Sequence, residues 1–197
     1  MRDLIMSDFL KNLAVPGPAP SGGAVAALGV AQAAALLARV AGADRELRAE
    51  AELLRMHALR LAEKDAHAVG RLAGPAAGGA GAAALAACLP AADVIAAAAE
   101  AVTLAERLLS GPGPSRAVPH GKVSPDVAAV AEIARSSALT ARVAIETRLG
   151  AAPGDAAIAL RAAMAGVDGL AERASWVTAA VRVANLPERP AEAAQVG

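Results

Sequence analysis

One acidic side chain stands out among the groups of this sequence that could do chemistry. Asp65 lies on the apolar face of a predicted helix over residues 44–72, because its neighbours at spacings of four and seven are Leu61, Val69 and Ala58. A carboxyl group in such surroundings could act as a general acid or base. The alternative is a buried carboxylate that caps a helix or pairs with a basic residue of another helix.

Other polar candidates lie further along the chain. Asp126 follows a Ser-Pro pair, where it is either a catalytic carboxylate or a plain helix-start residue that favours the helix dipole. Arg142 and Glu146 are four residues apart, which suits a surface ion pair as well as a substrate contact. His120, in the long loop over residues 110–125, could move a proton or hold a substrate carboxylate, or it is simply a solvated loop histidine.

A glycine pair opens the second predicted helix, in the stretch "PAPSGGAVAAL". Pro20 and the prolines before it prevent a helix, and Ser21 is predicted to cap the helix that follows. Gly22 and Gly23 would leave backbone N–H groups uncovered and let a flat ligand lie against the chain. Because the sequence places no histidine near Ser21, a cap is favoured over a nucleophile.

Helical periodicity dominates the chain, and no convincing stretch of alternating β-branched residues occurs. The sequence therefore predicts an all-α, multi-helical bundle in a single domain over residues 1–197, with a disordered tail at 186–197. A flexible link over 74–84 could begin a short helix that ends at Pro90. The other predicted helices cover residues 4–14, 21–40, 44–72, 91–109, 126–149 and 155–184.

Composition restricts the classes of function. With 19 basic and 19 acidic residues, one Trp, one Phe and no Tyr, the chain lacks the charge and the stacking rings that nucleic-acid binding uses. The histidines, cysteine and acids show no metal-ligand spacing, so we expect no metal and no cofactor. The single Cys88 lies in an apolar run and is predicted to be a packed thiol in a reducing cytoplasm.

The apolar run over residues 20–42 approaches the length of a membrane span. Gln32 and Arg39 interrupt it, and no Trp or Tyr anchors its ends, so we predict no membrane span. The charged residues Asp3, Asp8 and Lys11 lie where the apolar core of a signal peptide would be. We therefore predict no secretory signal peptide and expect a cytoplasmic location.

Five segments together resemble one known family. They are "SDFL" at 7–10, "PAPSGGAVAAL" at 18–28, "KDAHAV" at 64–69, "CLP" at 88–90 and "VSPDVAAVAE" at 123–132. Their order and spacing resemble those of the cyclodeaminase/methenyltetrahydrofolate cyclohydrolase family, the C-terminal half of formiminotransferase-cyclodeaminase and its stand-alone bacterial relatives. The likeness covers most of the chain and indicates a divergent member of that family.

The resemblance implies an all-helical, intertwined homodimer with a small-molecule substrate, a tetrahydrofolate derivative, bound in a crevice near the subunit interface. The implied reaction is metal-free acid/base chemistry on an amidine-like C–N bond, either closure of the formimino form with loss of ammonia or opening of the methenyl ring by water. Asp65 and Asp126 would be catalytic, with Pro20, Ser21, Gly22 and Gly23 as crevice wall.

The sequence also departs from the family pattern. Arg142 and Glu146 stand where family asparagines are expected, and Pro125 intervenes before Asp126. Two alternatives therefore stay beside the folate enzyme. One is a family member that cyclises or hydrolyses another imine or iminium substrate in specialised metabolism, and the other is a non-catalytic helical dimer that binds a ligand.

Overall fold

The computed structural model describes residues 6–16, 21–72, 80–110, 123–152 and 154–186. These residues form helices with no strand between them, which confirms the predicted all-α fold. The helices, in chain order, are α1 (Met6–Ala14), α2 (Gly22–Val40), α3 (Arg45–Leu72), α4 (Ala80–Ser110), α5 (Pro125–Leu149), α6 (Gly154–Ala165) and α7 (Val167–Asn185).

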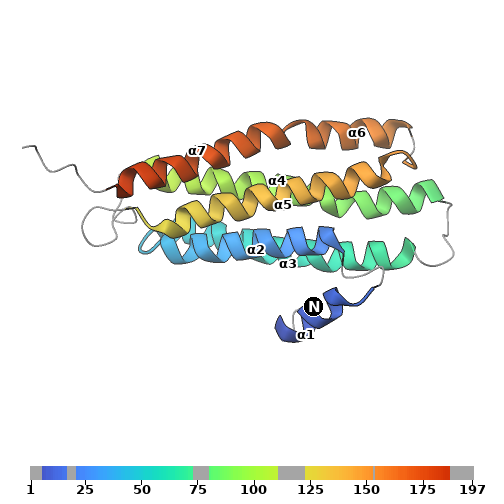
Figure 1. Cartoon of the computed structure of the whole chain (residues 1–197), viewed down its shortest axis with the longest axis horizontal. Helices are drawn as coiled ribbons and strands as arrows, with labels where there is room; N and C mark the ends of the chain where they lie inside the picture. The colour runs from blue at the N-terminus through green and yellow to red at the C-terminus, as the bar shows by residue number, and fades with distance from the viewer. Residues whose placement is uncertain (1–5, 17–20, 73–79, 111–122, 153, 187–197) are drawn as a thin grey trace, which may run out of the picture.

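The helices α2, α3, α4 and α5 pack side by side, with consecutive helices running in opposite directions (Figure 1). A short turn joins α2 to α3, and Gly42 in it has φ 57°, a conformation that glycine adopts without steric cost. The segment α6–α7 runs along α4 and α5. The helix α1 stands at the side of the bundle (Figure 1) and lines a pocket together with α2. One end of the bundle therefore carries the start of α2, the end of α3 and the end of α5.

Small side chains fill much of the core, as the alanine content requires. Alanines of α2, α4 and α5 are fully buried, and the largest buried side chains are leucines and valines with Ile145. The two helices α2 and α5 approach closely at Gly29, where an added methyl group would overlap the hydroxyl of Ser137. Close helix contacts replace the large rings that this sequence lacks.

Two predicted helix boundaries are wrong. We expected a helix to end at Pro90, but Pro90 lies inside the single long helix α4 and is buried there. Strong helix formers on both sides and packing against the neighbouring helices outweigh the one hydrogen bond that proline cannot make. The predicted helix over 155–184 is instead two helices, because Gly166 separates α6 from α7.

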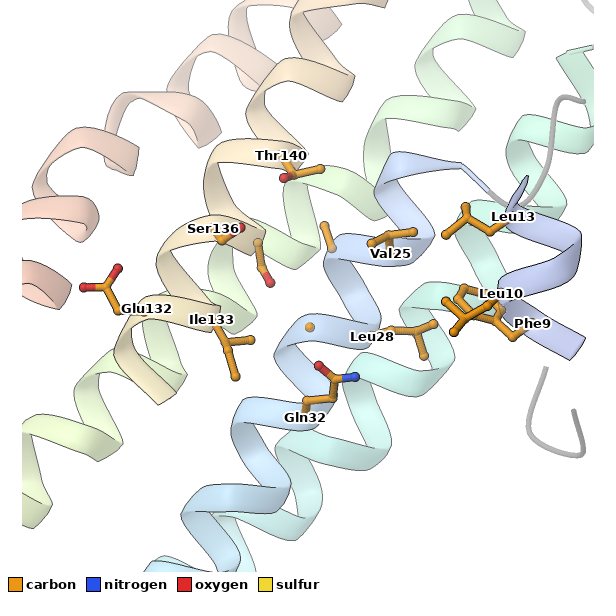
Figure 2. Close-up of a pocket in the computed structure, with 13 residues that line it drawn as sticks. Phe9, Leu10, Leu13, Val25, Leu28, Gln32, Glu132, Ile133, Ser136 and Thr140 are labelled. Atoms are coloured by element: carbon orange, nitrogen blue, oxygen red, sulfur yellow. The ribbon is translucent and has the colours of Figure 1, made fainter. Parts of the chain in front are cut away.

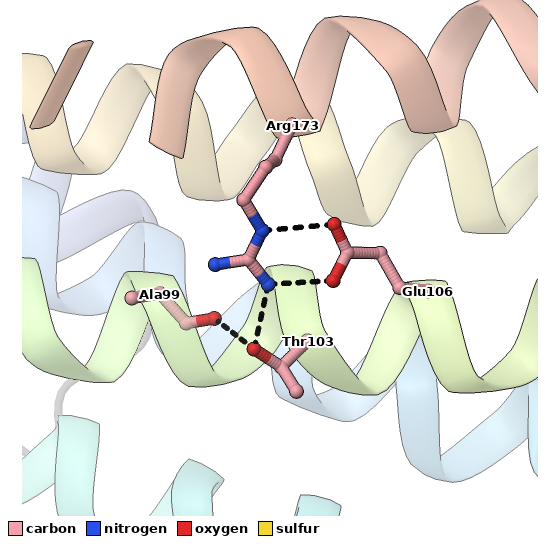
Figure 3. A network of polar contacts seen from close by, with 4 residues as sticks. All are labelled: Ala99, Thr103, Glu106 and Arg173. Carbon is pink, nitrogen blue, oxygen red and sulfur yellow. Dashed lines mark hydrogen bonds and ion pairs between the residues drawn. The ribbon is translucent and has the colours of Figure 1, made fainter. Parts of the chain in front are cut away.

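A polar network fastens α7 to α4 (Figure 3). Arg173 donates from Nε and Nη2 to the two carboxylate oxygens of Glu106, at 2.9 and 2.5 Å, and from Nη2 to Thr103 at 2.8 Å. The Arg173 hydrogen bond lowers the pKa of the Glu106 carboxyl group. Two parallel bonds to one carboxylate fix the rotation of α7 on the bundle.

By length and composition alone, α2 and the Gly81–Ser110 part of α4 could cross a membrane. About half of each stretch is buried inside the bundle, 50% in both cases. Core helices of helical bundles have the same composition, so these two helices are weak evidence of a membrane span.

Candidate active site

Asp65 lies buried at the end of the bundle where α2 begins. Its residue is only 2% exposed, as its place on the apolar face of α3 predicted. The hydroxyl of Ser21 donates a hydrogen bond to Asp65 Oδ2. The two residues are 44 positions apart in sequence, and the packing of α2 on α3 brings them together.

Ser21 is also the predicted N-cap of α2. Its Oγ accepts a hydrogen bond from the backbone N–H of Gly23 at 3.1 Å, so one hydroxyl links the helix start to the Asp65 carboxylate. This corrects part of the sequence interpretation, because the Gly23 N–H is not left uncovered for a ligand. A serine hydroxyl has one proton and two lone pairs, which suits both contacts at once.

Gly23 is needed for its close approach to the carboxylate. A methyl group at this position would come within 2.7 Å of Asp65 Cγ, a distance that real side chains do not show. Gly22 differs, since a methyl group there would be in ordinary contact with Thr140 at 3.7 Å. The two glycines therefore have different structural roles, and the packing of Asp65 requires glycine only at position 23.

A pocket of about 330 Å³ opens beside this cluster. Ser21, Gly22 and Gly23 form one wall of it. The opposite wall comes from the second half of α5, which contributes Thr140, Val143, Ala144, Thr147 and Arg148. Below, this space is called the Ser21 pocket.

Asp65 stands behind Ser21 and does not itself line the Ser21 pocket. The partly buried hydroxyl of Ser21 is the group that connects the carboxylate to the pocket. In this arrangement a proton taken by Ser21 from a bound molecule can pass to Asp65 and return by the same route. The geometry is therefore suited to moving protons at the pocket wall.

Asp126 lies at the other end of the bundle. It follows the N-cap residue Ser124 of α5 and pairs with Arg39 near the end of α2. Gly23 and Arg39 are 16 residues apart on one helix, which corresponds to about 24 Å of helix length. Within one chain, Asp126 and Asp65 therefore do not share a pocket, and a joint action of the two carboxylates on one substrate stays a prediction.

Arg142 and Glu146 pair with each other, as their spacing suggested, at 3.5 Å. Arg142 also bonds to Asp168 of α7 at 2.7 Å, so it ties α5 to α7. Neither residue lines the Ser21 pocket. Their predicted role in substrate binding has no support from the geometry of a single chain. Pro20 and His120 lie outside the described residues.

Sequence reasoning missed the α5 side of the pocket. Thr140, Thr147 and Arg148 line it, and their spacing of seven and eight places them on one helix face. Arg148 donates to the carbonyl of Ala144 at 2.6 Å and is only partly exposed. A polar stripe on an otherwise small-residue helix was the available signal.

Cys88 is fully buried, which agrees with the predicted packed thiol. Burial raises the pKa of this thiol, and the charge of Arg148 opposes that effect to a lesser degree. Among the described residues, no group of three or more His, Cys, Asp or Glu side chains could hold a metal ion. The expectation of metal-free chemistry stays a prediction.

A solved structure shares this fold. Formiminotetrahydrofolate cyclodeaminase from Thermotoga maritima superimposes with a TM-score of 0.76, over 92% of this chain and 98% of that chain, at 19% sequence identity. Comparisons with protein-family models and with curated proteins find no match. The chain therefore has the fold of a cyclodeaminase along nearly its whole length, as the sequence resemblance implied.

Proposed function

We propose that the chain is a divergent member of the cyclodeaminase/methenyltetrahydrofolate cyclohydrolase family and acts on a C–N bond of a folate-type one-carbon unit. The fold likeness to formiminotetrahydrofolate cyclodeaminase supports the family. The observation that carries the enzyme proposal is the buried Asp65, bonded to Ser21 and pressed against Gly23 beside a pocket. Here Ser21 and Gly23 of the resembling "PAPSGGAVAAL" segment meet Asp65 of the "KDAHAV" segment.

The proposed chemistry needs only proton transfers. In the cyclohydrolase direction, water adds to the methenyl carbon, one C–N bond breaks, and the products are the formyl compound and a proton. In the cyclodeaminase direction, the arylamine nitrogen of the folate linker adds to the formimino carbon on the ring nitrogen, and the imino nitrogen takes up protons and leaves as ammonia. Both pass through a tetrahedral carbon between two nitrogens, and Asp65 acting through Ser21 supplies or removes the proton.

A carboxylate behind Ser21 also provides negative charge close to the amidinium form of such a substrate. Preorganised charge of this kind stabilises a cation without reorganising solvent. Asp126 receives no catalytic role in the proposal, because its carboxylate pairs with Arg39 at the far end of α2. The proposal requires no metal and no other cofactor.

The test is a spectroscopic assay with 5,10-methenyltetrahydrofolate at controlled pH, corrected for spontaneous hydrolysis. We expect the methenyl chromophore to disappear faster in proportion to enzyme concentration. Formation of the chromophore from the 5-formimino compound, with release of ammonia, would identify the cyclodeaminase direction. If the protein accelerates neither reaction, the folate proposal fails.

A second candidate is a family member that acts on another imine or iminium substrate. It is favoured by Asp126 and Arg142, since both are held in ion pairs outside the Ser21 pocket at positions where the family pattern is altered. Absence of folate binding together with an accessible pocket would support this alternative. Tight folate binding without turnover would instead support a non-catalytic ligand-binding dimer.

The proposal includes a homodimer, as the resemblance implies, and a cytoplasmic location, as the lone Cys88 and the charged N-terminal residues suggested. Large apolar side chains on the surface are consistent with a protein contact, among them Leu53 at 71% and Trp176 at 56% exposure. Light scattering coupled to size-exclusion chromatography measures the mass directly. A mass of one chain across the working concentration range would remove the dimer from the proposal.

A further inference from the structure

A second and larger hollow lies between α1, α2 and α5 (Figure 2). Its volume is about 440 Å³, within the roughly 300 to 1,000 Å³ that small-molecule sites occupy. Below it is called the apolar pocket. The sequence segments that suggested the reaction do not assign this space to any role.

The walls of the apolar pocket are mostly hydrocarbon. Side chains of α1 and α2 face one another across it in Figure 2, with large apolar groups on both sides. Several of them keep much of their surface open: Leu10 is 53% exposed, Val25 38% and Leu13 37%. An apolar ring or chain bound here would cover that surface. The apolar residues in question are Phe9, Leu10, Leu13, Val25, Leu28 and Ile133.

A few polar groups interrupt this surface. Gln32 and Ser136 line the pocket and offer a donor and an acceptor each. Glu132 also lies at its edge, but its carboxylate is bonded to Thr178 at 2.8 Å and to Arg135 at 3.2 Å. The pocket therefore suits an uncharged group with one or two hydrogen-bonding atoms.

The apolar pocket adjoins the Ser21 pocket. Thr140 lines both spaces, with α5 residues 132–140 on one side of it and 140–148 on the other. Each of these stretches is about 12 Å long. The two spaces therefore follow one another along the seam between α2 and α5, and one elongated molecule can occupy both.

We propose that the apolar pocket is the second compartment of the substrate site and binds an uncharged, ring-bearing part of the substrate. The reactive C–N carbon of the same molecule lies in the Ser21 pocket. The placement of the reactive carbon in the Ser21 pocket depends on the function proposed above. The binding of an uncharged ring depends only on the lining and volume of the apolar pocket. The substrate class is thus an elongated molecule with its amidine-like carbon at one end and an apolar ring next to it.

The binding test uses 5-fluoroindole, an uncharged ring with one N–H donor, followed by 19F and 1H–15N NMR on the full chain. We expect saturable binding with shifts concentrated at Leu28, Gly29 and Gln32. Ser136→Phe fills the pocket from an exposed helix position, and Ser175→Phe on α7 is the matched control. We expect Ser136→Phe to weaken binding by at least about tenfold, and Ser175→Phe to leave it unchanged.

A second variant, Val25→Trp, fills the same space from α2 and guards against a folding defect in the first. With the folate substrate, both filling variants should raise KM by about tenfold or more while kcat changes little. Fluoroindole shifts elsewhere on the protein, or binding that neither filling variant weakens, would overturn the proposal. So would a dimer whose contact buries the pocket and prevents binding.

The outcomes separate this inference from the proposed reaction. If the wild-type protein binds fluoroindole in the apolar pocket but turns over neither folate compound, the reaction is wrong and the compartment stands. If folate turnover is normal and the filling variants leave KM unchanged, the reaction stands and the second compartment is wrong.

Discussion

Replacing Gly23 by Ala tests the contact that the candidate site depends on most. The added methyl group would come within 2.7 Å of Asp65 Cγ and overlap its carboxylate oxygens. Overpacking of this kind lowers the free energy of unfolding by about 1 to 3 kcal/mol, whereas the higher helix propensity of alanine raises it by about 1 kcal/mol. We therefore expect Gly23→Ala to lower the free energy of unfolding by up to about 2 kcal/mol.

Gly22→Ala is the matched control, because its methyl group would meet only Thr140 at an ordinary 3.7 Å. It should leave the free energy of unfolding unchanged or raise it slightly. Urea denaturation followed by circular dichroism measures both variants under the same conditions. The difference between two neighbouring glycines removes most effects of helix propensity.

A double-mutant cycle with Asp65→Ala completes this test. Without the carboxyl group, the methyl group of Gly23→Ala has space, so the cost of the glycine substitution should fall by about 1 kcal/mol or more. If Gly23→Ala is as stable as Gly22→Ala in the wild-type background, Asp65 does not lie against Gly23. The reasoning about the site would then be refuted.

Other predictions concern the polar contacts and the buried thiol. Ser21→Ala should cost about 1 to 3 kcal/mol of stability, because it removes the cap of α2 and leaves buried Asp65 without its hydroxyl donor, and thermal unfolding measures this. Arg173 lowers the pKa of Glu106, so this ion pair stabilises the fold at pH values above the usual carboxyl range, and the stabilisation is lost as the pH falls through the pKa of the folded state. Glu106→Gln should therefore reduce the loss of stability between neutral and acid pH by about 1 kcal/mol or less, since the pair is partly exposed, and urea denaturation at a series of pH values measures this. Cys88 should react slowly with a thiol reagent at neutral pH and quickly in denaturant, because burial raises its pKa and blocks access.

Helical periodicity carried most of the fold prediction. The apolar face of α3 placed Asp65 inside correctly, because spacings of three and four determine which side chains share a helix face. The predicted helix ends failed at Pro90, which lies buried inside the continuous helix α4, and at Gly166, where the predicted single helix divides into α6 and α7. A proline alone therefore did not determine where a helix ends, whereas a glycine that the sequence analysis passed over did.

The candidate site was only partly predictable. Ser21 was recognised as a cap and Asp65 as a buried carboxylate, but their hydrogen bond joins two helices and depends on their packing. The same limit explains Asp126, whose position relative to Asp65 follows from the direction of α2 and α5 in the bundle. The partners of Arg142 include Asp168 on α7, which helical spacing within α5 cannot indicate.

Turnover of 5,10-methenyltetrahydrofolate by Asp65→Asn tests the central claim most directly, with the exposed Asp93→Asn on α4 as control. Asparagine keeps the size of the side chain and an acceptor for Ser21, but it cannot take up a proton. The account predicts that kcat falls by about 10² or more for Asp65→Asn and stays at the wild-type value for Asp93→Asn. A folded Asp65→Asn protein with wild-type turnover would contradict it.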